Sequence, residues 1–137
     1  MIAQTEKQTI RLISQLESVI LVERLIDDLR EQLDFKDDFY GNILVSVSEA
    51  VKNAIEHGNK NDPDKSVLLS YEMKDGFLTF TVSDEGTGFD YQKLPDPTLP
   101  ENIEKIKGRG IFFMTQLSDG ISYENFGSTV KLVFRLA

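Results

Sequence analysis

Apolar side chains recur at helical spacing over two long stretches in the first half of the chain. From Ser18 onward they come every three or four residues with charged side chains between them, which predicts an amphipathic helix with one buried face. These apolar positions are Val22, Leu25, Ile26, Leu29 and Leu33. A second helix is expected over residues 39–57. We expect it to end at Gly58, because glycine readily adopts the positive φ angle common at helix C-termini.

The second predicted helix has two contrasting faces. At about 100° per residue its apolar side chains cluster on one side, and a polar stripe lies nearly opposite. The apolar positions are Ile43, Leu44, Val47, Val51, Ala54 and Ile55. The polar stripe consists of Asn42, Glu49, Asn53 and Glu56. One face is therefore expected to enter a core, and the other to present a specific set of polar groups.

Five segments have strand-like patterns. They are residues 8–14, 66–74, 77–84, 121–124 and 128–136. The second and third are joined by Asp75-Gly76, a strong hairpin signal, so we expect them to pair antiparallel.

Alternation along two of these segments identifies their core faces. In the third segment the apolar face holds Leu78, Phe80 and Val82. Alternation places Asp84 on this same face at the end of the strand, so a carboxylate is expected to point inward. In the last segment the core face is expected to hold Val130, Leu132, Phe134 and Leu136, with Ser128 sharing it.

A long segment without apolar periodicity separates the hairpin from the last helix and strands. Residues 90–107 contain three of the four prolines and are expected to form an extended loop, a feature that usually has a functional reason. Gly108-Arg109-Gly110 then opens a predicted helix over residues 111–117. Strands grouped mainly into hairpins predict an α+β fold, a two-layer sandwich whose mostly antiparallel mixed sheet carries helices on one face. We expect residues 1–137 to form a single domain.

Composition narrows the possible classes of protein. The 15 Lys and Arg residues against 23 Asp and Glu residues give a net charge of −8, which disfavours direct binding to nucleic acid. The absence of cysteine excludes disulfides and thiolate chemistry. No apolar run approaches the roughly 20 residues of a membrane helix, so we expect a cytoplasmic protein that does not enter a membrane.

The first candidate for chemistry is the pair Glu49 and Asn53, one helical turn apart on the polar stripe. A carboxylate and an amide carbonyl in this arrangement offer a base and an oxygen ligand that suits Mg²⁺, whose shell is usually completed by phosphate oxygens. The alternative is an ordinary solvated helix face.

Two glycine-containing segments are further candidates. In Asp84-Glu85-Gly86-Thr87-Gly88 the glycines allow a ligand to approach the backbone, and Asp84 can accept a hydrogen bond from an exocyclic amine. The alternative is a glycine-rich turn in which the aspartate bonds its own backbone. In Gly108-Arg109-Gly110 the backbone N–H groups and the arginine can hold phosphate, whereas the alternative is a flexible hinge. His57 is more typical of a helix-terminal residue that interacts with the last carbonyls.

The motifs occur in a recognisable order. They are Glu49-x-x-x-Asn53-Ala54-x-x-His57-Gly58, Asp84-x-Gly86-x-Gly88, the proline-rich loop, Gly108-x-Gly110 and Gly127-Ser128. Over about residues 40–134 this order resembles the GHKL superfamily of ATP-binding proteins, with a histidine-kinase-like ATPase fold. The sequence motif around Glu49 is most similar to that of anti-sigma factor serine/threonine kinases, since histidine kinases usually have Asn at that position.

The resemblance implies a nucleotide site with ATP and Mg²⁺ as cofactors. Asn53 would ligate the metal, Asp84 would bind the adenine amino group with support from Ser128, and Glu49 would be the catalytic base. The glycines Gly86 and Gly88 would shape the nucleotide turn. Residues 90–107 would be the ATP lid, and the phosphate contacts would come from Gly108, Arg109 and Gly110.

The resemblance also implies protein partners. It suggests a homodimer that sequesters a sigma factor and phosphorylates a small anti-anti-sigma protein. One alternative is an ATP-binding signalling module of the histidine-kinase type, and the other is a regulator that acts on its partner by contact alone.

Overall fold

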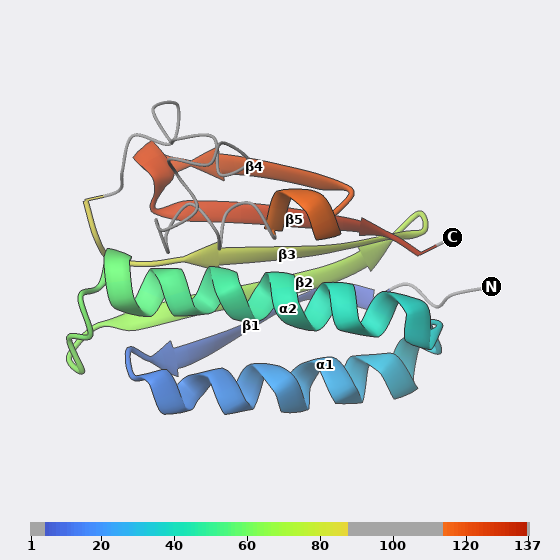
Figure 1. The fold of residues 1–137 in the computed structure, drawn as a ribbon, viewed down its shortest axis with the longest axis horizontal. Helices are drawn as coiled ribbons and strands as arrows, with labels where there is room; N and C mark the ends of the chain where they lie inside the picture. The colour runs from blue at the N-terminus through green and yellow to red at the C-terminus, as the bar shows by residue number, and fades with distance from the viewer. Residues whose placement is uncertain (1–4, 88–113, 137) are drawn as a thin grey trace, which may run out of the picture.

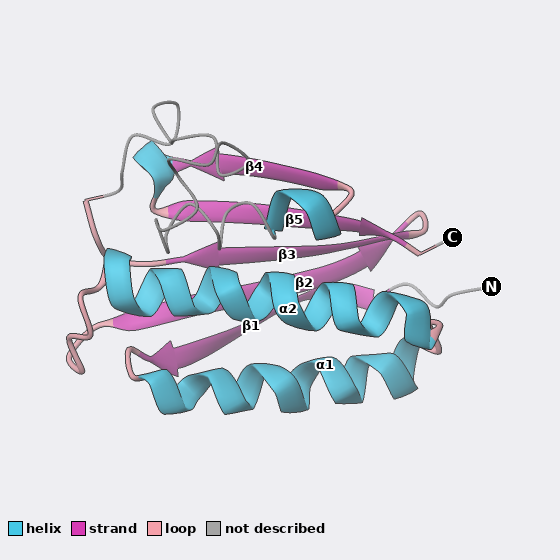
Figure 2. Cartoon of the chain, viewed as in Figure 1, coloured by secondary structure: helices cyan, strands magenta, loops and turns pink. Residues whose placement is uncertain are grey.

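The computed structural model describes residues 5–87 and 114–136, which form a sheet with two long helices on one face (Figures 1 and 2). The strands are β1 (Thr5–Ile13), β2 (Ser66–Lys74), β3 (Phe77–Ser83), β4 (Gly120–Glu124) and β5 (Thr129–Arg135). Their order across the sheet is β1-β2-β3-β5-β4. Each described pairing is antiparallel. The expected two-layer α+β architecture is confirmed, and no parallel pair of the expected mixed sheet lies in the described residues.

The two predicted helices are present on the same face of the sheet. A short 3-10 turn, η1 (Leu16–Ser18), leads into α1 (Val19–Leu33), whose periodic apolar side chains are buried or partly buried. The second helix, α2 (Asp37–Asn53), begins two residues earlier than the pattern predicts. The early start is favourable because Asp37 and Asp38 lie in the first turn, where negative charge complements the helix dipole.

The helical segment ends at Gly58, as predicted, but not through the expected conformation. After Asn53 the chain continues into a wider π-helical turn, η2 (Ala54–Gly58), in which the Asn59 N–H donates to the Ala54 carbonyl at 2.8 Å. Among the described glycines, positive φ angles occur at Gly76 and Gly127 and not at Gly58. The prediction that Gly58 ends the helix through a left-handed conformation is therefore wrong, and its role is steric, as shown below.

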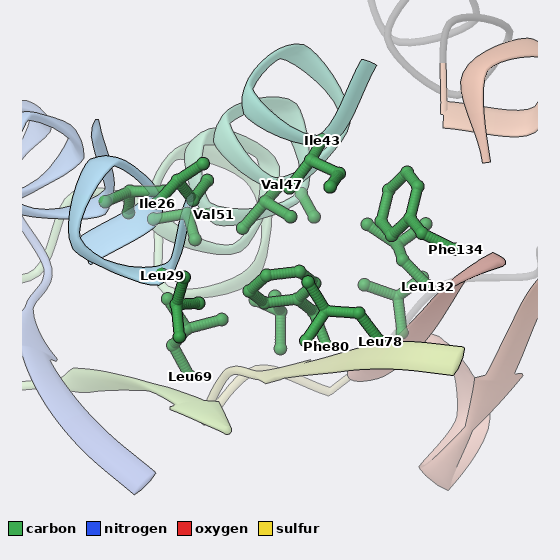
Figure 3. Close-up of a cluster of buried hydrophobic side chains, with 14 of the residues drawn as sticks. Ile26, Leu29, Ile43, Val47, Val51, Leu69, Leu78, Phe80, Leu132 and Phe134 are labelled. Atoms are coloured by element: carbon green, nitrogen blue, oxygen red, sulfur yellow. The ribbon is translucent and has the colours of Figure 1, made fainter. Parts of the chain in front are cut away.

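The core lies between the helices and the inner face of the sheet (Figure 3). Phe80 is 0% exposed at its centre, and its ring packs edge-on against Phe134 with centroids 6.1 Å apart. The labelled side chains come from all the layers: Ile26, Leu29, Ile43, Val47, Val51, Leu69, Leu78, Phe80, Leu132 and Phe134. Burying each side chain of this size contributes about 1.5–3 kcal/mol, so the apolar periodicities are the main source of the fold.

The predicted hairpin is confirmed residue by residue. Lys74 pairs with Phe77, and the two residues between them have φ angles of 55° at Asp75 and 85° at Gly76. Positive φ at both positions gives the turn the twist that antiparallel strands require. The hairpin therefore sets the register that carries β3 toward Asp84.

Several predicted strand boundaries shift by one to three residues. The first strand extends earlier, over Thr5–Ile13, at one edge of the described sheet. The last strand begins at Thr129, because Ser128 adopts a helical conformation (φ −77°, ψ −10°) in a turn. Alternation consequently does not extend to Ser128, and the expectation that it shares the strand face of Val130 is wrong. Of the predicted helix 111–117, residues 114–117 are described and are helical.

Several predicted site residues lie outside the described residues. They are Gly88, the lid segment 90–107, Gly108, Arg109 and Gly110. In the described part of the chain, no helix combines the length and apolarity that a bilayer crossing requires.

Candidate functional site

The C-terminal end of α2, the end of β3 and the turn η5 (Asn125–Gly127) lie at the same end of the sheet (Figure 1). Glu49 and Asn53 project from the last two turns of α2, and both are half-buried. Their one-turn spacing places the carboxylate and the amide on the same side of the helix. The predicted polar stripe is thus neither fully solvated nor part of the core.

The π-helical turn η2 brings the helix end close to the strand end. π-turns widen the helix locally and are common at functional sites. Here the turn buries Ala54 and Ile55 and leads into Asn59, which is 1% exposed. The exposed His57 lies in this turn, with Nε2 4.0 Å from the Glu56 carboxylate.

Gly58 allows the Asp84 carboxylate to lie against the helix end. A Cβ atom built on Gly58 would lie 2.3 Å from Oδ2 of Asp84, closer than any real side chain can approach. A Cβ on Gly86 would lie 2.3 Å from the Gly58 carbonyl oxygen. Gly58, Asp84 and Gly86 therefore pack so closely that the two glycine positions cannot carry a side chain. This contact brings a motif of the helix and a motif of the strand end together.

Asp84 is half-buried, and its backbone continues the sheet for one more step. Its N–H donates to the Ser128 carbonyl at 2.9 Å, and its Oδ1 accepts the Gly86 N–H at 2.8 Å. The local aspartate–backbone bond considered as an alternative is therefore present. It leaves Oδ2 on the side of the carboxylate that faces Gly58.

Burial raises the pKa of the Asp84 carboxyl above its ordinary value. The Gly86 hydrogen bond and the positive charge of Lys65 act in the opposite direction but do not outweigh the desolvation. A carboxylate held in such an environment at a strand end is typical of a binding residue rather than of an ordinary surface aspartate.

Ser128 lies beside Asp84, although not in the expected way. Its hydroxyl donates to the Asn125 carbonyl at 2.9 Å within its own turn, so its contact with Asp84 runs through the backbone carbonyl. The neighbouring Thr129 is buried, and its Oγ1 lies 3.0 Å from the Ser83 hydroxyl. The Ser128 carbonyl and the Thr129 side chain thus secure the junction between β3 and β5 next to Asp84.

Sequence reasoning missed Asn59 and Glu85. The Asn59 side chain donates to the Ser66 carbonyl at 2.9 Å and accepts the Glu85 N–H at 2.8 Å. The available signal was an asparagine directly after the His57-Gly58 pair, but its two side-chain partners lie 7 and 26 residues further along the chain.

The donor set fits a magnesium ion that completes its shell with phosphate. Within residues 5–87 and 114–136, no group of three or more His, Cys, Asp or Glu side chains forms a ready-made metal site. Mg²⁺ needs only one or two protein oxygens when phosphates and waters supply the others. Asn53 and Glu49 offer such oxygens on one side of α2.

A family model described as the histidine kinase-like ATPase domain matches residues 12–134. The chain belongs to this family. Use of ATP is the property common to the family, as its description states.

Within the family, the relatives are anti-sigma factors and serine kinases, which confirms the resemblance based on the sequence motifs. Anti-sigma F factor from Geobacillus thermodenitrificans is 38% identical over 112 residues, which cover 77% of this chain and 76% of the relative. Serine-protein kinase RsbW from Staphylococcus epidermidis is 28% identical over 131 residues, which cover 90% and 82%.

A solved structure has the same fold. The crystal structure of the RsbU and RsbW domains of Rv1364c from Mycobacterium tuberculosis matches with a TM-score of 0.67 at 20% identity. The match covers 96% of this chain and 33% of that chain, so this protein corresponds to about a third of it.

Proposed function

We propose that this chain is an anti-sigma factor with serine/threonine kinase activity, which binds Mg–ATP and transfers the γ-phosphoryl group to a small anti-anti-sigma protein. The observation that carries the proposal is the glycine-dependent contact between the end of α2 and Asp84 in a member of the histidine kinase-like ATPase family. The relatives' names supply the kind of partner.

The adenine end of the site is assigned to Asp84. Its carboxylate accepts a hydrogen bond from the exocyclic amino group, and the glycines Gly58 and Gly86 allow that carboxylate to lie against the helix end. Ser128 supports Asp84 through its backbone carbonyl. Gly88 belongs to the nucleotide turn, together with Gly86, and residues 90–107 are the ATP lid. The phosphate contacts come from Gly108, Arg109 and Gly110.

The phosphate end is assigned to the polar face of α2. Asn53 holds Mg²⁺, which neutralises charge on the ATP phosphates when bound. Glu49 takes the proton from the substrate hydroxyl while that oxygen attacks the γ-phosphorus, the bond to the β-phosphate oxygen breaks, and ADP leaves. Because phosphoryl transfer depends mainly on position and charge neutralisation, the base needs reach more than a shifted pKa.

The wider assignment follows the same family. Residues 1–137 form one domain that acts in the cytoplasm as a homodimer and sequesters a sigma factor until the anti-anti-sigma protein releases it. It has no direct role in binding nucleic acid, in keeping with its net charge of −8.

Calorimetry with ATP in the presence and absence of Mg²⁺ tests the pocket, with Asn53→Ala beside the wild type. We expect Mg²⁺-dependent binding to the wild type and a loss of at least about tenfold in the variant, equivalent to about 1.4 kcal/mol. No binding by the wild type at millimolar ATP would overturn the assignment.

Transfer of phosphate separates a kinase from a regulator that acts by contact alone. Glu49→Gln retains the size of the side chain and removes the base, so it should retain ATP binding and lose phosphorylation of the partner serine by about 10²-fold or more. If the wild type binds ATP and partner but transfers no phosphate, the contact-only alternative replaces the kinase.

A further inference from the structure

Three consecutive backbone N–H groups after β3 each have a defined acceptor. The Asp84 N–H donates to the Ser128 carbonyl at 2.9 Å, and the Gly86 N–H donates to Asp84 Oδ1 at 2.8 Å. Between them, the Glu85 N–H donates to Oδ1 of Asn59 at 2.8 Å. The middle acceptor is a side chain from another part of the chain. It therefore ties the segment to the end of the helix.

Both polar groups of the Asn59 side-chain amide are hydrogen-bonded. It is 1% exposed, its Nδ2 donates to the Ser66 carbonyl at 2.9 Å, and its own N–H closes the π-helical turn on Ala54. A buried amide that donates and accepts in this way cannot rotate without leaving polar groups unpaired. Asn59 consequently fixes the positions of the helix end, the start of β2 and the segment after β3 relative to one another.

A third hydrogen bond closes a ring. The Ser66 N–H donates to the Glu85 carboxylate at 2.5 Å, so Asn59, Ser66 and Glu85 are linked pairwise. Each of the three residues comes from a different segment. The ring resists sliding of any one segment past the other two, because each movement breaks at least two of the three bonds.

The ring lies directly beside the contact that defines the site. Asn59 follows Gly58 in the chain, and Glu85 follows Asp84, so the Asn59–Glu85 bond is one residue away from the Gly58–Asp84 contact on both sides. With Gly58 and Asp84 already closer than a Cβ atom would allow, a small shift of either segment moves the carboxylate. The position of Asp84 thus depends on the side chain of Asn59.

We infer that Asn59 is a positioning residue for Asp84, which sets both the affinity for ATP and the preference for its 6-amino group. This rests on the proposed function, in which Asp84 contacts the adenine. Asn59 does not touch the nucleotide in this account. It acts by holding the carboxylate at the distance and angle at which it distinguishes an amino group from an oxygen.

The test compares ATP with ITP, which carries a carbonyl oxygen in place of the 6-amino group. The full chain, Asn59→Ala and a control are titrated with each nucleotide in the presence of Mg²⁺ by calorimetry. The control is Val22→Ala in α1, a core position that is 0% exposed and lies outside the proposed site. This control variant should destabilise the fold without changing the hydrogen bonds among Asn59, Ser66 and Glu85.

We expect Asn59→Ala to raise the dissociation constant for ATP about tenfold and to bring the ATP-to-ITP affinity ratio close to one, with an unchanged number of sites. A residue that only stabilises the fold would lower the number of competent sites and leave the ratio intact, as expected for Val22→Ala. A wild-type ratio in folded Asn59→Ala overturns the inference.

Two further outcomes are informative. If Asn59→Ala does not fold, Asn59→Ser puts a shorter hydroxyl in place of the amide that bridges the Ser66 carbonyl and the Glu85 N–H, and an unchanged ATP-to-ITP ratio in that variant overturns the inference. If the wild type binds ATP no better than ITP, the adenine role of Asp84 fails and the inference fails with it, and if the wild type binds neither nucleotide, the proposed nucleotide site itself fails.

Discussion

The middle of the sheet is stabilised by the burial of apolar side chains, whereas its end at Asp84 is held by close contacts and hydrogen bonds between particular atoms. In the middle, Phe80, Leu132 and their neighbours are buried on all sides, and the two helices cover them. Their stability comes from apolar area removed from water, which is not directional. Residues of similar size and shape can replace one another there at modest cost.

At the end of the sheet, single atoms decide the geometry. Asp84, Gly58 and Gly86 contact one another where no Cβ atom fits, and Asn59 accepts a hydrogen bond from the N–H of the adjacent Glu85. The α-helix widens into a π-turn, and burial raises the pKa of the Asp84 carboxyl. The comparison teaches that the core of this protein tolerates substitutions of similar size, whereas the end at Asp84 has no room for an added side-chain atom.

The largest expected effect is on the core. Phe80→Ala should cost about 3–5 kcal/mol of folding free energy, because it leaves a cavity between the sheet and the helices. Phe77→Ala on the same strand is the matched control, since Phe77 is 41% exposed on the opposite face and should cost about 1 kcal/mol or less. Denaturant unfolding measures both, and equal losses would contradict the assigned faces of β3.

Two glycines of the second helical segment sharpen the comparison. Gly58→Ala forces a Cβ onto the Asp84 carboxylate and should cost about 1–3 kcal/mol while weakening ATP binding. Gly41→Ala meets nothing within 4 Å and should stabilise α2 by about 0.5–1 kcal/mol with unchanged ATP binding. Thermal unfolding and nucleotide titration check both variants. A neutral Gly58→Ala would remove the steric role assigned to Gly58.

The smallest expected effect on stability comes from Asp84→Asn, which should nonetheless abolish ATP binding. Because Gly86 already occupies Oδ1, the new amide would direct its NH₂ group at the adenine amine, donor against donor. The fold should remain intact, since the variant removes a carboxylate whose ionised form is disfavoured by burial.

The sign of the pH dependence follows from the raised pKa of Asp84. The ionised carboxylate is less favourable in the folded than in the unfolded chain, so wild-type stability relative to Asp84→Asn is highest at low pH and falls as pH rises through that pKa. Denaturation midpoints of both proteins across acidic and neutral pH measure the difference. A wild type that gains stability over the variant as pH rises would contradict the burial effect.

Much of the fold was predictable because its signals are local. The Asp75-Gly76 turn and the alternating Leu78 and Phe80 predict the hairpin and its inner face, and both are confirmed. The prediction for Ser128 is wrong because the turn over Asn125–Gly127 extends one residue further and interrupts the alternation. The reason given for Gly58 is wrong as well, because its constraint comes from Asp84, which is distant in the chain.

The sequence by itself determined the sheet and helices, the inward direction of Asp84 and the order of motifs that the family shares. Those features depend on periodicity and on short-range turn chemistry, which any window of the chain displays. Only the tertiary structure decided that Asn59 joins three segments and that Gly58 must lack a side chain. These are contacts between residues far apart in the chain, and the free energy of a close contact or a buried hydrogen bond depends on where its partner lies.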